Sequence, residues 1–253
     1  MKPRLRIARA WMGGMTATMC LACSGASLPN QAPAGSAQPA NSVVQAKPKD
    51  PLFSPQNLGL LDAQDRDLWQ KPDQIMDLLK LAEGSIVADL GAGGGWFTIR
   101  LARRVGAERG IVYAEDIQDL MLEALERRSD REGLKNIRAV KGDTVDPKLP
   151  EPVDAALIVD AYHEMEDPED PSRIVTLLTN VGRSLKPQGC LGVVDFEPGG
   201  GGPGPDPDER VSPDRIVHSA EAAGLKLLRR EALPPFQFLL IFGRATGQSR
   251  CAS

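Results

Sequence analysis

The sequence predicts an α/β fold in which a mostly parallel, doubly wound sheet is covered by helices on both faces. Three observations lead to it. Strand-like apolar runs alternate with amphipathic helical segments over most of the chain. The first such run, residues 86–90, opens directly into a glycine-rich turn and a helix, a nucleotide-binding arrangement. The last two runs are joined only by Pro234-Pro235, so they should pair antiparallel.

Each element follows from a local pattern. Helices are expected where apolar residues recur at helical spacing after a polar or proline start signal, at residues 74–81, 96–106, 118–131, 171–185 and 212–223. Strands are expected in short apolar runs bounded by turn residues, at residues 86–90, 111–116, 137–140, 153–159, 191–196, 225–233 and 236–244. The helix at 118–131 should bury Leu120, Met121, Leu122 and Leu125, and residues 198–209, rich in Gly and Pro, should form a flexible loop.

The glycine-rich turn has the pattern D-x-G-x-G-x-G, formed by Asp89, Gly91, Gly93 and Gly95. Glycines let the backbone turn sharply and approach a ligand, and the helix that follows directs free N–H groups at it. A dinucleotide site of an NAD-dependent oxidoreductase would need a small residue where Trp96 stands. An acid before the first glycine suits a ligand with a cationic amino group and repels a diphosphate. The alternative is a tight turn without a ligand.

This pattern resembles motif I of the class I methyltransferases that use S-adenosyl-L-methionine (AdoMet). The resemblance spans residues 65–245. It implies a Rossmann-like, doubly wound, seven-stranded, mostly parallel sheet with a terminal antiparallel β-hairpin, AdoMet as cofactor, and methyl transfer as the activity. Residues 66–72 resemble a segment of one uncharacterised bacterial branch of this superfamily, where it would lie over the cofactor mouth. Trp69 would then be a lid residue or a packed anchor.

Three further acids complete the expected cofactor site. Glu115 and Asp116 end a strand about twenty residues beyond the glycine loop, where a carboxylate can accept ribose hydroxyl protons. By resemblance the ribose-binding residue is Asp116. Glu115 should face the other side, because strand side chains alternate; the alternative is an exposed acidic pair. The resemblance also places Asp143 near the adenine amino group. Asp160, at the end of a buried strand, can reach the methionine end of the cofactor or the substrate.

His163 and Tyr162 are the residues expected to act on the methyl acceptor. They follow a buried strand at its carboxyl end, where ligands of open α/β sheets bind. His163 is one of two histidines and the best-placed general base; the alternative is a loop histidine satisfied by neighbouring backbone. Methyl transfer from a sulfonium depends mainly on in-line positioning in a dry site. A base is needed only if the acceptor loses a proton.

No metal is expected. Asp160 and Asp195 occupy positions similar to the magnesium-binding acids of catechol-type O-methyltransferases, but those enzymes have an asparagine where this chain has Phe196. The four cysteines show no zinc spacing. Cys190 is expected to be a small buried apolar residue, with a Cys190–Cys251 disulfide as the alternative.

The N-terminus resembles a targeting signal. Residues 1–22 combine a basic start with an uncharged stretch that is too short to span a membrane. They are followed by Cys23 in a context resembling a bacterial lipoprotein cleavage site, although Cys20 stands where leucine is usual. Cys23 would then carry a lipid. Residues 23–52, rich in Ser, Pro and Ala, are predicted to be a disordered tether. The methyltransferase domain is expected at 53–247 and a tail at 248–253.

The charge of the chain limits its partners. Removing residues 1–22 takes away four positive charges and no negative ones, so the formal charge falls from −4 to −8. Nucleic acid is therefore not expected as a partner, because binding it needs clustered Lys and Arg. We expect a small-molecule acceptor and membrane contact only through a lipid on Cys23. The expected location is the cell envelope, or the cytoplasm if the start codon is misassigned. The alternative function is a catalytically inactive, envelope-anchored binding protein that keeps the fold.

Overall fold

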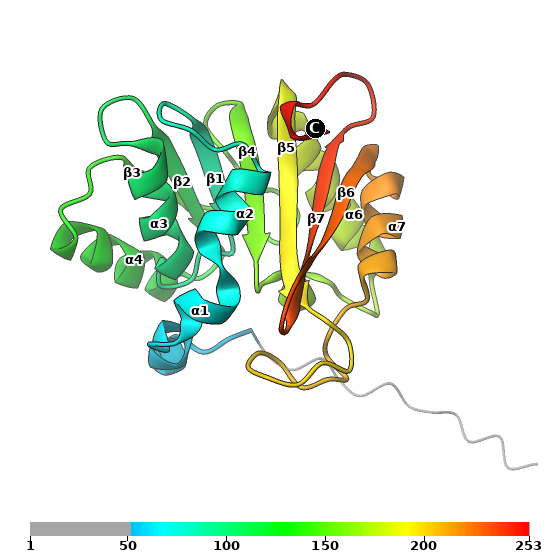
Figure 1. Ribbon diagram of the computed structural model, residues 1–253, viewed down its shortest axis with the longest axis horizontal. Helices are drawn as coiled ribbons and strands as arrows, with labels where there is room; N and C mark the ends of the chain where they lie inside the picture. Colours follow the sequence, from blue (N-terminus) through cyan, green and yellow to red (C-terminus); the bar gives the residue numbers. More distant parts are fainter. Residues whose placement is uncertain (1–51, 253) are drawn as a thin grey trace, which may run out of the picture. The chain divides into compact units, whose positions relative to one another are not determined.

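A seven-stranded sheet forms the centre of the computed structural model, which describes residues 52–252. The expectations for residues 1–51 lie outside the described part. The strand order is β3-β2-β1-β4-β5-β7-β6 (Figure 1). The bounds are β1 Ile86–Leu90, β2 Ile111–Asp116, β3 Ile137–Lys141, β4 Val153–Val159, β5 Leu185–Phe196, β6 Leu225–Leu233 and β7 Gln237–Arg244. Strands β1 to β5 pair in parallel, and β7 runs antiparallel between β5 and β6. The predicted fold is thus confirmed, including the terminal hairpin.

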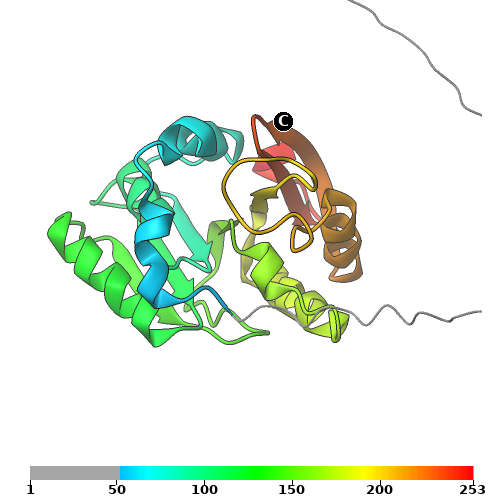
Figure 2. The same cartoon turned by 90° about the horizontal axis from the view of Figure 1, so that it is seen from below.

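Helices cover both faces of the sheet (Figures 1 and 2). The bounds are η1 Pro55–Asp62, α1 Arg66–Gln70, α2 Pro72–Leu78, α3 Trp96–Val105, α4 Asp119–Arg131, α5 Tyr162–Met165, α6 Pro171–Ser184, α7 Pro213–Ala222 and η2 Arg250–Ala252. Helices α2 and α3 pack on one face, where Val87 of β1 contributes to the core. Helices α6 and α7 pack on the other, which receives Ala88 and Leu90. This burial on both sides explains why the central strands read as continuous apolar runs.

The helix predictions hold with three corrections. Helix α2 begins at Pro72 rather than 74, α1 and α5 were not predicted, and residues 186–189, which resemble a stop after a helix, are already part of β5. Leu120 is 53% exposed, whereas Met121, Leu122 and Leu125 are buried. The reason is geometric, because consecutive helical residues point about 100° apart and a single face cannot hold all four.

A disulfide joins Cys190 of β5 to Cys251 of η2. Both residues are fully buried. This corrects the expectation that Cys190 is merely a small apolar core residue. It also corrects the tail assigned to residues 248–253, because η2 packs against the sheet through this bond.

Removing this disulfide should destabilise the fold. The bond closes a loop of 61 residues, for which chain-entropy arguments give about 4 kcal/mol. Cys251→Ser is therefore expected to lower the free energy of unfolding by about that amount, as measured by urea denaturation. The wild type reduced with dithiothreitol should fall to the level of the Cys190→Ser/Cys251→Ser variant. An unchanged midpoint in both would show that the cysteines are not paired.

Candidate functional site

A cavity of about 370 Å³ lies at the carboxyl ends of β1, β2 and β4. The glycine loop forms part of its wall, and Gly91, Gly93 and Gly95 have φ angles of +69°, +52° and +80°. Side chains rarely tolerate this region. A Cβ on Gly91 would also come within 2.9 Å of the Ala161 side chain. Helix α3 starts directly after the loop, so its unpaired N–H groups are available to a ligand in the cavity.

Asp89 and Asp116, the two acids expected to flank the cofactor, both line this cavity. Asp89 accepts a hydrogen bond of 2.6 Å from Thr98 of α3, and burial raises its pKa to about 6. The Asp116 carboxylate accepts from the backbone N–H of Gly93 at 2.9 Å and of Gln118 at 2.8 Å. Burial also raises the pKa of Asp116. The predicted acids are therefore brought together around the glycine loop.

Glu115 lines the same cavity, which corrects the prediction that it faces away. The residue is 4% exposed. Its carboxylate accepts a hydrogen bond from the backbone N–H of Gly91 at 3.3 Å. The Glu115 side chain is long enough to reach the backbone at the end of β1. It fills the space that a side chain at position 142 would need, which is left open because residue 142 is glycine. A Cβ on Gly142 would lie 1.9 Å from its oxygen. Burial raises the pKa of Glu115 to about 8, and the neighbouring charge of Asp116 adds to this effect.

This raised pKa predicts a pH-dependent stability. The folded chain holds the Glu115 proton more tightly than the unfolded chain, whose pKa is near 4.5. The resulting stabilisation is full below that value and is lost as the pH rises through about 8. Glu115→Gln keeps a neutral side chain at every pH. The free energy of unfolding of the variant should match that of the wild type near pH 4 and exceed it near pH 9 by on the order of 5 kcal/mol, as measured by urea denaturation. Glu126→Gln, at an exposed position of α4, should show no such divergence.

Asp143 also lines the first cavity, in the turn after β3. Its carboxylate accepts from the backbone N–H groups of Val145 at 3.0 Å and Asp146 at 2.8 Å, and it forms an ion pair with Lys148 at 3.0 Å. These backbone hydrogen bonds and the lysine keep the pKa of Asp143 below its ordinary value. The acid is therefore ionised at neutral pH and held at the wall of the cavity. Its contact with adenine stays a prediction.

The segment before α1 covers the glycine loop, which sequence reasoning missed. The backbone of Phe53 donates to Glu164 at 3.0 Å and accepts from the Gln118 side chain at 3.1 Å. Further along, Asp62 forms an ion pair of 2.7 Å with Arg128 of α4. Leu58 packs so close to Gly94 that a Cβ there would lie 2.8 Å from it. This segment therefore forms one wall of the cavity.

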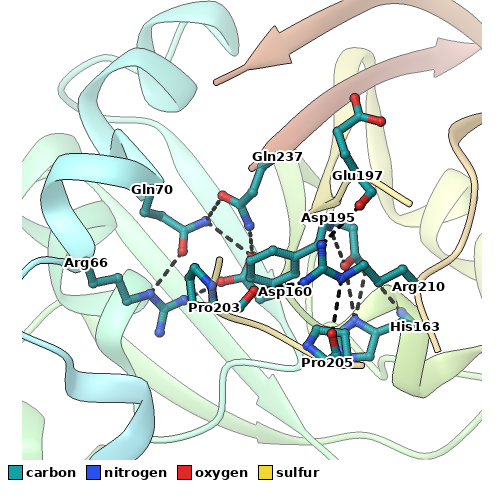
Figure 3. Close-up of polar contacts among 11 residues, drawn as sticks. Arg66, Gln70, Asp160, His163, Asp195, Glu197, Pro203, Pro205, Arg210 and Gln237 are labelled. Carbon is teal, nitrogen blue, oxygen red and sulfur yellow. Dashed lines mark hydrogen bonds and ion pairs between the residues drawn. The ribbon is translucent and has the colours of Figure 1, made fainter. Parts of the chain in front are cut away.

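Asp160, at the end of β4, is held by three side chains (Figure 3). Arg66 forms an ion pair with it at 2.7 Å, Gln70 donates at 3.2 Å, and Gln237 donates to the same oxygen as Gln70. Burial raises the pKa of Asp160, and the charge of Arg66 opposes that rise. The Arg66 guanidinium also lies 4.2 Å over the ring of Trp96. The carboxylate thus ties α1 to β4 and β7, and its contact with the cofactor stays a prediction.

A second cavity, of about 610 Å³, adjoins the first. The two share five lining residues: Phe53, Leu61, Arg66, Asp160 and Glu164. His163, Trp69 and Phe196 line the second cavity and not the first. Ligands bound in the two cavities would therefore be neighbours across a shared wall.

His163 is paired with Asp195 of β5 (Figure 3). The ring nitrogen Nδ1 lies 3.1 Å from the carboxylate, which also accepts from the backbone N–H of His163 at 3.1 Å and of Phe196 at 2.8 Å. Burial by itself lowers the pKa of His163, but the hydrogen bond and charge of Asp195 raise it by more. The ring is therefore oriented by a carboxylate. The alternative, a loop histidine satisfied by neighbouring backbone, does not describe this contact.

Tyr162 lies away from both cavities. It is 0% exposed and belongs to the core beneath α6 and α7. Burial raises its pKa. This position contradicts the prediction that Tyr162 acts on the acceptor. Adjacent residues of α5 point about 100° apart, so His163 faces the second cavity while Tyr162 faces the core.

Two features of the second cavity were not foreseen in full. Trp69, a lid or anchor candidate, packs 6.0 Å from the ring of Phe196 and 6.3 Å from that of Phe236, so it is an anchor that also lines the cavity. Arg210 donates to backbone carbonyls along the loop expected to be flexible. These belong to Glu197, Pro203 and Pro205, which Figure 3 shows, and to Gly200. The guanidinium thereby fixes the course of residues 198–209.

Within residues 52–252, no group of three or more His, Cys, Asp or Glu side chains is arranged to hold a metal ion. The two acids compared with magnesium ligands have other partners. Asp160 pairs with Arg66, and Asp195 pairs with His163.

Comparisons with known proteins concern the fold that carries this site. Residues 87–189, which include the glycine loop, β2 and His163, match the family model described as "Methyltransferase domain". An AdoMet-dependent methyltransferase from Aquifex aeolicus superposes with a TM-score of 0.68 and 27% identity, over 75% of this chain and 98% of that one. A second AdoMet-dependent methyltransferase, from Clostridium acetobutylicum, superposes with a TM-score of 0.57 and 13% identity. This match covers 75% of this chain and 99% of that one.

A third structure shares the fold and was solved with ligands. NcsB1, an O-methyltransferase from neocarzinostatin biosynthesis in complex with S-adenosyl-L-homocysteine and 1,4-dihydroxy-2-naphthoic acid, gives a TM-score of 0.60 at 18% identity. The match covers 75% of this chain and 57% of NcsB1. Residues 87–189 therefore resemble a methyltransferase domain, and the chain has the Rossmann-like α/β fold of the AdoMet-dependent methyltransferases on which it superposes.

Proposed function

We propose that this protein is an AdoMet-dependent methyltransferase that acts on a small-molecule acceptor. The observation that carries the proposal is the first cavity, where a left-handed glycine loop, the start of α3 and two buried acids meet. AdoMet supplies an electrophilic methyl group on a sulfonium. The cavity suits such a donor, because its acids would attract a cationic ligand and repel phosphates.

Each acid has a separate task in this proposal. Asp116 accepts the ribose hydroxyl protons, since its carboxylate stands beside Gly93 at the end of β2. Asp89 faces the methionyl amino group, whose positive charge would favour ionisation of a carboxyl with a pKa near 6. Asp143 receives the adenine amino group at the wall formed after β3.

The acceptor side lies in the second cavity. Its shared wall with the first allows donor and acceptor to be held in line, which is the main requirement for displacement at a methyl carbon. His163 is the general base, with Asp195 orienting its ring. The alternative of an inactive binding protein does not account for a paired histidine beside the cofactor cavity.

We also propose that the protein resides in the cell envelope, secreted or anchored through a lipid on Cys23. The Cys190–Cys251 disulfide supports this location, because such bonds persist mainly in oxidising compartments. Among residues 52–252, no helix has the length and apolar character needed to cross a bilayer. Cys23→Ala should move the protein from the membrane fraction to the soluble fraction of cells. Persistence of the variant in the membrane fraction would contradict a lipid anchor.

Calorimetric titration of the full chain tests the enzyme proposal. We expect AdoMet to bind with a micromolar Kd and NAD not to bind, because Trp96 occupies the position where a dinucleotide site needs a small residue. Absence of AdoMet binding would overturn the proposal. Binding of NAD instead would favour an oxidoreductase.

A further inference from the structure

The wall of the second cavity combines charged side chains with an apolar part that suits a flat molecule. Trp69 and Phe196 lie on its lining with their ring centres 6.0 Å apart, and Val211 and Pro205 add apolar surface. Contacts between aromatic rings contribute beyond the burial of their apolar surface. The volume of about 610 Å³ is in the range of pockets that enclose drug-sized ligands. The walls therefore favour an organic molecule with one or two rings.

His163 provides this cavity with a basic side chain. Nδ1 of His163 is engaged by Asp195, which is almost fully buried and held by two backbone N–H groups. The tautomer inferred from this bond carries its proton on Nδ1 and leaves Nε2 as the basic nitrogen. Among the described residues, none is hydrogen-bonded to Nε2. A preoriented base at the acceptor side is useful only if the acceptor atom gives up a proton.

This requirement separates the possible acceptor atoms. A neutral amine attacks with its lone pair and can lose its proton to water afterwards. A thiol, with a pKa near 8.5, is already partly ionised. A hydroxyl needs a base. The pKa of a phenol, about 10, lies much closer to that of an imidazole than does the pKa of an aliphatic alcohol, which is about 16 like that of water. Proton transfer is most efficient when the donor and acceptor pKa values are close.

We propose that the second cavity binds a planar aromatic compound and that a phenolic hydroxyl of this compound is the methyl acceptor. This inference rests on the proposed function. In the reaction, the hydroxyl oxygen bonds to the methyl carbon while the carbon–sulfur bond of the sulfonium breaks and leaves its electron pair on sulfur. The hydroxyl proton passes to Nε2 of His163 and later to water. Trp69 and Phe196 hold the ring, and Asp195 positions the base.

Three shape-matched probes test the acceptor class. The full chain is incubated with methyl-tritiated AdoMet and 2-naphthol, 2-naphthylamine or decahydro-2-naphthol. We expect label transfer to 2-naphthol to be at least about tenfold faster than to the other two. Equal or faster transfer to the amine or the saturated alcohol overturns the inference. So does absence of transfer to all three when calorimetry shows that AdoMet binds. Absence of AdoMet binding marks failure of the proposed function instead.

The two histidines provide a matched pair of variants. His163→Gln should reduce transfer to 2-naphthol by about 100-fold or more while leaving the Kd for AdoMet within about twofold. His218→Gln, on the exposed side of α7, should change neither. Asp195→Asn adds a readout that a purely structural residue would not affect. Because Asp195 raises the pKa of His163, its loss should move the acidic limb of the pH–rate profile to lower pH. An unchanged rate in His163→Gln would overturn the assignment of the base.

Discussion

Asp116→Asn is expected to weaken AdoMet binding at least about 100-fold. The carboxylate stands at the end of β2 in the first cavity, where it would accept both ribose hydroxyl protons of AdoMet. Hydrogen bonds to a charged group contribute about 1.5–3 kcal/mol each, and 1.4 kcal/mol corresponds to a tenfold change in Kd. Asparagine keeps the size of the side chain and one carbonyl oxygen, so the loop contact to Gly93 can persist.

Calorimetric titration of the full-length variant measures this effect. Asp119→Asn is the matched control, because this acid lies three residues further along, at the exposed start of α4, and pairs with Lys141 at the surface. The control should bind AdoMet like the wild type. A Kd for Asp116→Asn within threefold of the wild-type value would mean that another residue binds the ribose, and Glu115 would be the next to test.

Arg66→Met should lower the free energy of unfolding by about 3–5 kcal/mol. The guanidinium is buried between Asp160 and the ring of Trp96. Methionine fills a similar volume but leaves the carboxylate in a dry environment without a cation. Removing one partner of a buried ion pair has this cost. Urea denaturation, with the disulfide intact, measures the change.

The double variant Arg66→Met/Asp160→Asn distinguishes the charge from the packing. Replacing the carboxylate with a neutral amide removes the unpaired charge, so at least about 1 kcal/mol of the loss should be recovered. A single variant that loses less than 1 kcal/mol would show that Asp160 is protonated in the folded protein. No recovery in the double variant would assign the loss to packing against Trp96 instead.

The fold was largely predictable because its signals are local. The bounds of β1, β2 and β6 follow from apolar runs that end at glycine, acidic or proline residues, and the structure matches these bounds. Two of the side chains placed wrongly, Leu120 and Tyr162, share one cause. Each stands beside another candidate on a helix, and a sequence alone does not say which neighbour faces inward.

The candidate site was predictable in part. The glycine loop, Asp89 and Asp116 follow from spacing within one strand–turn–helix unit and the next strand. The pairing of Asp160 with Arg66 spans 94 residues, and that of His163 with Asp195 spans 32. Such contacts arise only when the sheet brings the carboxyl ends of β4 and β5 together with α1. The resemblance of residues 66–72 places Arg66 and Gln70 over the cofactor mouth but does not reveal Asp160 as their partner, and Gln237 carries no motif.

A crystal structure of the full chain with S-adenosyl-L-homocysteine tests the central claim most directly. We predict that the ribose hydroxyls contact the Asp116 carboxylate and that the sulfur faces the shared wall with the second cavity, toward His163. A ligand whose sulfur points away from that wall, or one bound outside the first cavity, would contradict the account.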